Sequence, residues 1–142
     1  MEIFDDRFLA TIEQVVTMHH TLYPQIAPQG IFFESLALRA FHLAGASGAN
    51  VAQTTANMAG ADLVVGDERS SLKTETGKST RAGHIKITKL CTTEQEPWEA
   101  GSLVDRTIAH LSRYDRLLML RATWHHEEIR YQLLEIPLDL LR

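Results

Sequence analysis

The sequence is poor in cysteine, in long apolar runs and in net positive charge. Cys91 is its one cysteine, so no disulfide can form within the chain and a reducing compartment is expected. No apolar run approaches the roughly 18 residues that cross a bilayer, and the acidic start of the chain is unlike a signal peptide. These absences favour a cytoplasmic protein with no membrane partner.

The charge balance also limits the function classes. A formal net charge of −4 argues against a histone-like or polybasic binder. It does not exclude a nuclease, because a metal ion and a local basic strip can bind nucleic acid where the overall charge balance is acidic. The segment Gly77-Lys78 resembles the end of a phosphate-binding P-loop, but Leu72 stands where that motif needs glycine, which excludes nucleotide binding there. No nucleophile-and-base pair is visible to support a small-molecule enzyme.

At 142 residues the chain is expected to form a single domain, residues 1–142, with its core at about 31–137. Apolar residues at helical spacing predict helices over 5–23, 31–44 and 98–113. The apolar face expected on the third helix carries Leu103, Val104, Thr107, Ile108 and Leu111.

The remaining regular segments favour strands. β-Branched or alternating runs predict strands at 61–65, 70–75, 84–90, 116–124 and 129–136. The polar turn at 66–68 joins the first two as a hairpin, and 46–60 is interpreted as a loop or a short helix. From residue 31 onward the order is helix, three strands, helix, strand. This order predicts an α+β sandwich, a mixed β-sheet flanked by helices, with a further helix at the N-terminus.

The predicted hairpin carries the most informative polar side chains. Ser71, Lys73 and Glu75 alternate along its second strand and therefore project from one face. Asp62 lies across from them in an apolar strand, where an unpaired carboxylate is costly. An acid beside a lysine suits metal-assisted phosphodiester cleavage, because the carboxylate holds a divalent cation and the ammonium positions the attacking water. The alternative is that Lys73 and Glu75 are solvated charges on an edge strand.

A second acid is aligned with the apolar side of a predicted helix. Glu34 has Leu38 and Phe41 at plus four and plus seven on its own helical face. Such a glutamate either pairs with a buried cation or lies at the edge of the stripe and reaches water. Because a cation is expected near Asp62 on other grounds, Glu34 becomes a candidate metal ligand.

These residues carry a resemblance to a known group of enzymes. The order helix, three strands, helix, strand is similar to the core of the PD-(D/E)xK nuclease superfamily, that of type II restriction endonucleases. The glutamate on the helix, the aspartate at the first strand and the x-x-Lys on the next sit where that superfamily has its site. The strings Ser-Leu-Lys-Thr-Glu-Thr-Gly-Lys (71–78) and Tyr-Gln-Leu-Leu-Glu-Ile-Pro (131–137) also resemble its strands.

The resemblance implies a Mg²⁺-dependent DNA endonuclease, with Mn²⁺ as a possible substitute. Asp62 and a second acid, Glu34 first and Glu75 second, would bind the metal. Lys73 would orient the water or steady the developing negative charge, and Ser71 would add a hydrogen bond. The basic and polar loop 78–86 lies beside the site and could contact phosphates of double-stranded DNA. Cutting both strands of a palindrome calls for two related sites, which implies a homodimer.

Two positions depart from the pattern of the superfamily. Ala61 stands where a proline usually precedes the aspartate, and Ser71 replaces the acid two residues before the lysine. Serine is a far poorer metal ligand than a carboxylate. An alternative is therefore a catalytically inactive DNA-binding or protein-interaction module with the nuclease fold, or one part of a split nuclease.

Overall fold

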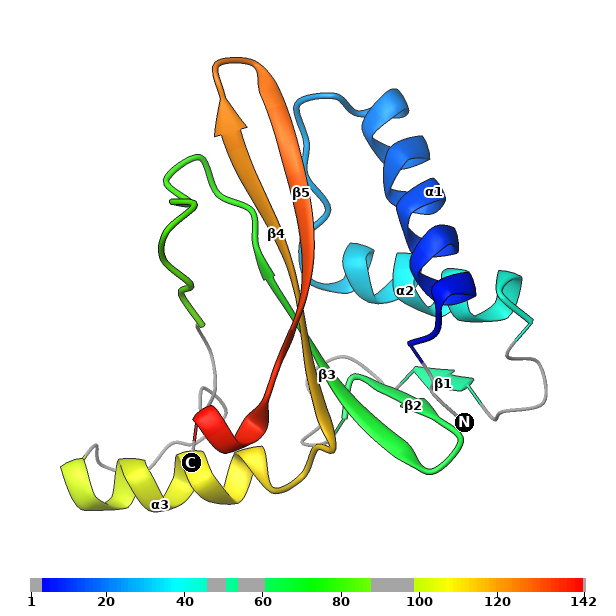
Figure 1. Cartoon of the computed structure of the whole chain (residues 1–142). Coiled ribbons are helices and arrows are strands. Elements are labelled where there is room, and N and C mark those ends of the chain that lie inside the picture. Colours follow the sequence, from blue (N-terminus) through cyan, green and yellow to red (C-terminus); the bar gives the residue numbers. More distant parts are fainter. Residues whose placement is uncertain (1–3, 46–50, 54–60, 88–98, 142) are drawn as a thin grey trace.

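The chain folds around a mixed β-sheet with two helices on one face and a third beneath its end (Figure 1). The structure, a computed structural model, describes residues 4–45, 51–53, 61–87 and 99–141. The described part of the chain contributes five strands in the spatial order β1-β2-β3-β4-β5. The α+β class predicted from the sequence is confirmed.

Two helices precede the sheet, as predicted. Helix α1 spans Asp6–Leu22 and helix α2 spans Ile31–Leu43. The carboxylate of Asp5 accepts a hydrogen bond from the amide of Phe8 (2.8 Å), which begins α1 by satisfying one of its free amides. Gly30, with φ of 51° and ψ of −123°, starts α2 in a conformation that other residues avoid.

The strands form a sheet in which one pair is parallel. Their bounds are Val51–Gln53 for β1, Leu63–Val65 for β2, Glu68–Glu75 for β3, Arg116–His125 for β4 and Glu128–Ile136 for β5. β3 and β4 pair in parallel, whereas β1–β2, β2–β3 and β4–β5 pair antiparallel. A parallel pair needs a crossover, and helix α3 (Ala100–Leu111) lies within it.

Apolar side chains cover both faces of the sheet. On one face, α1 and α2 pack against β2, β3 and β4, and the rings of Phe8 and Phe41 stack with centroids 4.1 Å apart. A second cluster on the other face gathers Leu111, Leu117 and Met119 around Tyr114. Alternation along β3 explains the division, because Leu72 points to the helical face while Ser71 and Lys73 point the other way.

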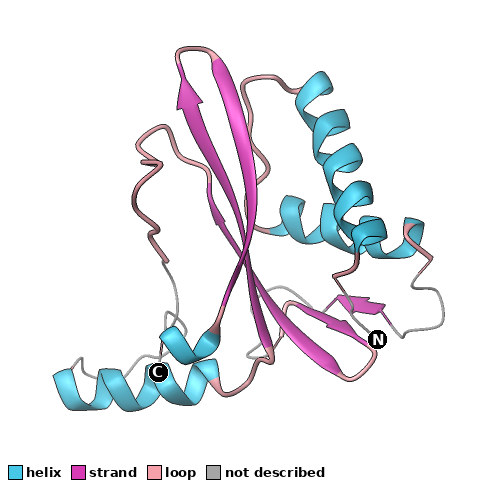
Figure 2. Ribbon diagram, viewed as in Figure 1, coloured by secondary structure: helices cyan, strands magenta, loops and turns pink. Residues whose placement is uncertain are grey.

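The strand predicted at 84–90 is wrong over the residues that the structure describes. Residues 84–87 form no strand, and residues 88–90 lie outside the described part of the chain (Figure 2). The backbone carbonyls of Arg81 and His84 accept hydrogen bonds from the side chain of Arg121 on β4, so this segment is held by a side chain and not by a strand ladder. An additional strand, β1, lies before β2 instead, within the stretch 46–60 where the sequence predicts a loop or a short helix. Residues 46–50 and 54–60 are outside the described residues.

Helix α3 is shorter than predicted and buries less. Of its expected apolar face only Leu111 is fully buried, whereas Val104 and Ile108 are largely exposed. None of the helices in the described ranges is both long enough and apolar enough to traverse a bilayer.

The β2–β3 turn depends on one glycine. Gly66 has φ of 61°, and together with Asp67 it forms the two-residue hairpin connection. We expect Gly66→Ala to lower the free energy of unfolding by about 1–2 kcal/mol, because a Cβ is disfavoured in the left-handed region. Urea unfolding measures the change. Asp67→Ala is the control, expected to cost less than about 0.5 kcal/mol, and equal losses in both variants would contradict the assignment of strain to Gly66.

Candidate active site at the strand fork

The site begins where β2 and β3 separate. Their ladder spans Leu63–Val65 and Glu68–Ser70, and the amide of Asp62 adds one more bond to the carbonyl of Ser70 (3.0 Å). Beyond that point β3 keeps β4 on one side, and within the described part of the chain no strand pairs with the amides of its other edge toward Glu75. We call this point the strand fork.

The carboxylate of Asp62 replaces the missing partner. Its Oδ2 accepts a hydrogen bond from the backbone N–H of Leu72 (2.7 Å) and another from the hydroxyl of Ser71 (3.1 Å). Asp62 therefore ends the pairing of β2 with β3 and is itself held in a fixed direction. Both of these bonds reach Oδ2, and from the described residues Oδ1 accepts none.

Lys73 lies beside the same carboxylate. Its Nζ is 3.6 Å from Oδ2 of Asp62, and the two side chains are 18% and 26% exposed. This distance exceeds a hydrogen bond, so the charges attract without a locked geometry. Partial burial weakens solvent screening of the pair. The predicted neighbourhood of Asp62, Ser71 and Lys73 is thus present in the fold.

Glu75 is engaged by a different partner. Its Oε2 accepts a hydrogen bond from Nε of Arg121 on the paired position of β4 (2.7 Å), and only 13% of the Glu75 side chain is exposed. The carboxylate shares the face of Lys73, as alternation predicts, but its charge is balanced by Arg121. Sequence reasoning missed Arg121. The signal was available, because a charged residue in the leucine-rich run 116–124 needs a partner for the same reason as Asp62.

The fork opens into a groove of about 720 Å³ along the free edge of β3. Gly30 and Glu34 at the start of α2, Asp62 just before β2 and Lys73 on β3 are among the residues that line it. The remaining lining residues are Gln29, Ile31 and Phe32 around the start of α2, Leu72, Thr74 and Glu75 on β3, and Thr76, Gly77, Ser79, Thr80 and Lys86 after β3. The groove therefore brings Glu34 and the fork to one cavity, although they come from separate elements.

The groove offers a metal ion only a few charged ligands. In the described ranges, no group of three or more His, Cys, Asp or Glu side chains is arranged to hold a metal ion. Mg²⁺ in phosphoryl-transfer sites often uses only one or two carboxylates, with water and substrate phosphate completing the shell. Oδ1 of Asp62 and the carboxylate of Glu34 fit that smaller requirement.

An α+β fold with an acid and a lysine at the fork of two strands is consistent with a restriction-endonuclease-like core. Comparison with known proteins gives a similarity to one such enzyme. Over 141 residues, 99% of the chain, the sequence is 28% identical to the type II restriction enzyme SmaI of Serratia marcescens. The chain spans 56% of the length of that enzyme. No family model and no solved structure matches the chain.

Proposed function

We propose that this chain is a metal-dependent DNA endonuclease of the type II restriction kind, with a PD-(D/E)xK-like site at the strand fork. The observation that carries the proposal is the approach of Lys73 Nζ to Asp62 Oδ2 at 3.6 Å, inside a groove that Glu34 also lines. The similarity to a type II restriction enzyme over nearly the whole chain supports the same proposal.

Asp62 and Glu34 would hold Mg²⁺, or Mn²⁺ in its place. Oδ1 of Asp62 is the oxygen that is not used by Ser71 or Leu72, which leaves it available to a cation. The ion would supply charge neutralisation at the scissile phosphate and a more acidic water at neutral pH. Glu75 is a weaker candidate ligand, because Arg121 already balances its charge.

The residues of the chain then have distinct tasks. Lys73 places a positive charge where negative charge develops on the phosphate and orients the attacking water. Ser71 is fully buried and donates to Asp62, so it fixes the direction of that carboxylate instead of binding metal itself. The amide of Leu72 acts in the same way from the backbone. Asp62 is therefore preorganised by two donors before any metal binds.

The proposal includes the substrate and the assembly. Double-stranded DNA is the substrate, and a homodimer supplies the two related sites needed to cut both strands. With one cysteine and no disulfide, the enzyme suits a reducing cytoplasm. Because the chain spans only 56% of SmaI, activity of this chain alone is part of what is proposed.

A second candidate function follows from Ser71. It occupies the place of an acid, and its hydroxyl is committed to Asp62. If one or two carboxylates prove too few to hold the metal, the chain is a DNA-binding or protein-interaction module with the nuclease fold, or one part of a split nuclease. DNA binding without cutting distinguishes this alternative from the first.

Supercoiled plasmid tests the proposal directly. We expect Mg²⁺ to support conversion to nicked or linear forms and EDTA to prevent it, because Lys73 and Asp62 act on phosphate only with the metal charge in place. Agarose gels follow the conversion over time. Folded protein that shifts DNA in a gel but leaves the plasmid intact in both Mg²⁺ and Mn²⁺ would contradict the enzyme and favour the binding module.

A further inference from the structure

A buried arginine connects the face of the sheet to the segment that follows β3. Arg121 lies in the middle of β4 with only 2% of its side chain exposed, and its Nε donates to Oε2 of Glu75 at 2.7 Å. Burying a guanidinium is costly unless it is paired and hydrogen-bonded. Glu75 supplies the charge, but it uses only one edge of the planar group.

Backbone carbonyls use the other edge. Nη2 of Arg121 donates to the carbonyl of Arg81 at 2.7 Å and to that of His84, and Nη1 lies 3.5 Å from the carbonyl of Ala82. These carbonyls belong to residues that form no strand, so the guanidinium satisfies groups that a β-ladder would otherwise have paired. One side chain thus fixes the turn at 81–84.

The same strand also holds the beginning of this segment. The indole Nε1 of Trp124 donates to the carbonyl of Thr76 at 3.1 Å, and Nζ of Lys78 lies 5.4 Å from the centroid of the Trp124 ring. β4 therefore secures residues 76–87 at two points, near the start through Trp124 and near the end through Arg121. We call residues 76–87 the basic loop.

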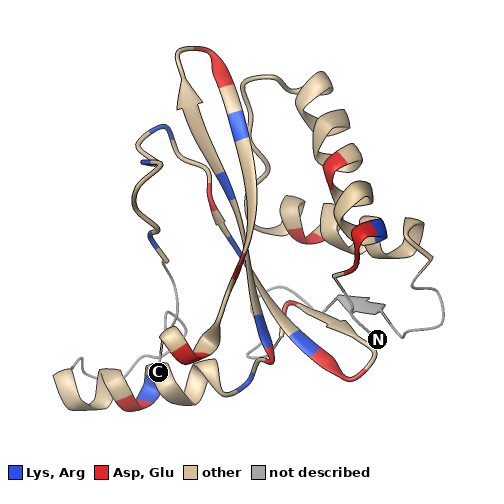
Figure 3. Cartoon of the chain, viewed as in Figure 1, with Lys and Arg blue, Asp and Glu red and all other residues tan. Residues whose placement is uncertain are grey.

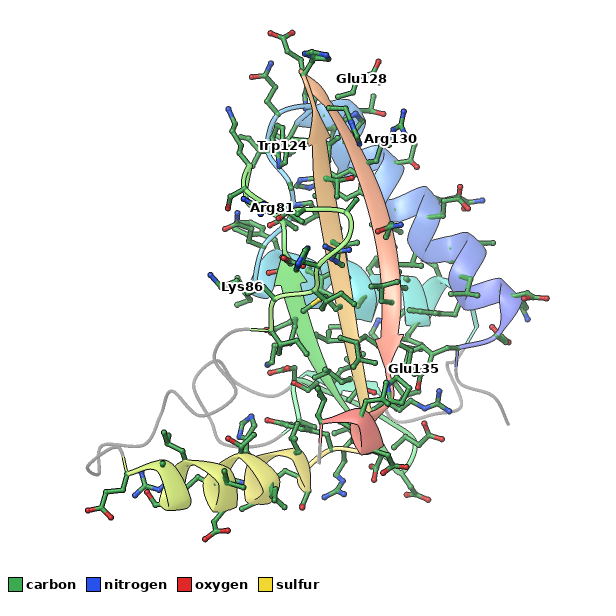
Figure 4. The ribbon with its side chains drawn as sticks, turned by 60° about the vertical axis from the view of Figure 1, so that its left-hand side comes forward. Arg81, Lys86, Trp124, Glu128, Arg130 and Glu135 are labelled. Atoms are coloured by element: carbon green, nitrogen blue, oxygen red, sulfur yellow. The ribbon has the colours of Figure 1, made fainter. Side chains whose placement is uncertain are left out.

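The basic loop carries charge of one sign. Lys78, Arg81 and Lys86 are exposed, and no acidic residue occurs between 76 and 87, in a chain whose net charge is −4. Figure 3 shows basic residues following one another along this loop beside β3 and β4. Arg81 and Lys86 project on the same side of the molecule in Figure 4, and Lys86 lines the groove that holds Asp62.

We propose that Arg121 is a positioning residue that holds the basic loop as a phosphate-binding wall of the groove, where it contacts the backbone of duplex DNA. The inference rests on the proposed function, because it says how the same groove binds its DNA substrate. Phosphate contacts set the register of a duplex without reading its sequence, which suits a wall fixed relative to the strand fork. Arg121 itself touches no substrate, since it is covered by Glu75 and the loop.

The inference also gives Glu75 a structural role. Its carboxylate serves as the counter-charge of Arg121, so it supports the loop instead of binding metal. Loss of either partner is then expected to have the same consequence for DNA. A lysine at position 121 keeps the charge but cannot reach Glu75 and the carbonyls of Arg81 and His84 together, because its ammonium is a single point of donation.

The experiment compares the full-length wild type with Arg121→Lys and Glu75→Gln. Arg116→Lys is the matched control, since Arg116 is an ion-paired arginine on the same strand that contacts Glu68 and Glu135 and does not line the groove. Duplex affinity is measured in EDTA across about 50–200 mM salt, where binding does not depend on cleavage. Hydrogen exchange of the loop amides is measured on the same samples, at a temperature at which circular dichroism shows every variant folded.

We expect both test variants to lose about 10-fold in affinity and to show a salt dependence that is shallower by about 1–3 units, because each phosphate contact contributes about 0.9 to that slope. Loop amides exchange faster in both, whereas amides of α1 and α2 do not change. At saturating protein in Mg²⁺, cleavage of bound DNA by Arg121→Lys stays within about 3-fold of wild type, and Arg116→Lys matches wild type throughout.

Three results would overturn the inference. Faster loop exchange with unchanged affinity and salt slope would make Arg121 a stability element only. Unchanged loop exchange would mean that Arg121 does not hold the loop. Loss of cleavage at saturation in Glu75→Gln but not in Arg121→Lys would mean that Glu75 binds the metal. Wild type that binds DNA with the expected slope but never cuts it would instead contradict the proposed catalysis and leave the DNA-binding wall supported.

Discussion

Replacing Lys73 by methionine is expected to lower the single-turnover rate of DNA cleavage by about 10²- to 10³-fold. Methionine keeps most of the length and apolar packing of the lysine but removes the charge that lies 3.6 Å from Asp62. If Lys73 acts on charge that develops in the transition state, the rate falls while ground-state affinity changes little. Quenched-flow or manual time courses at saturating protein measure the rate, and a gel shift in EDTA measures affinity.

Arg130→Met is the control for the loss of one cation. Arg130 is exposed on β5 and does not line the groove (Figure 4). It is expected to cleave at the wild-type rate. If Lys73→Met cuts at the wild-type rate, or if its DNA affinity falls as strongly as its cleavage rate, then Lys73 does not act in the chemical step.

The second large effect is expected at Asp62. Mg²⁺ at about 100 times its dissociation constant should stabilise the wild type by about 2.7 kcal/mol, equivalent to a rise in Tm of about 5–10 °C for a chain of this size. Asp62→Asn should abolish most of this rise and the cleavage with it, because the neutral amide is a poor ligand for Mg²⁺. Differential scanning fluorimetry with and without Mg²⁺ measures the shift.

Asparagine is the informative substitution because it tests metal binding while it keeps the hydrogen bonding that supports the fold. Its amide oxygen can still accept the hydrogen bond from Leu72, whereas Asp62→Ala would leave that N–H unpaired at a cost of about 1–3 kcal/mol. Asp67→Asn in the exposed turn of the same hairpin is the control and should keep the full shift. An equal Mg²⁺ shift in wild type and Asp62→Asn would place the metal elsewhere.

Most of the fold could be predicted because local patterns and packing agree. The helices α1 and α2 follow apolar spacing that the core uses, and Gly66 marks the hairpin turn. Residues 84–87 mislead because they alternate in polarity, yet a strand also requires a backbone partner, and the carbonyls of Arg81 and His84 bond to the side chain of Arg121 instead. Spacing alone cannot report that a side chain from a distant strand takes these hydrogen bonds.

The site was predictable where it depends on neighbouring strands. Strand alternation and the short turn are enough to bring Asp62 to Ser71 and Lys73. The partner of Glu75 could not be predicted in this way, because it lies on β4, which is parallel to β3 and far away in the chain. Register between distant strands is set by the packing of the whole sheet, so Arg121 could be suspected from its apolar surroundings but not assigned to Glu75.

Cleavage of supercoiled plasmid by Asp62→Asn and Lys73→Met, beside Asp67→Asn and Arg130→Met, tests the central claim most directly. All proteins are compared at equal folded concentration, with Mg²⁺ and with EDTA. Metal-dependent cutting by wild type and both controls, with loss in both fork variants, is the result that a catalytic site of Asp62 and Lys73 predicts. Cutting that survives in either fork variant at the rate of its control would contradict it.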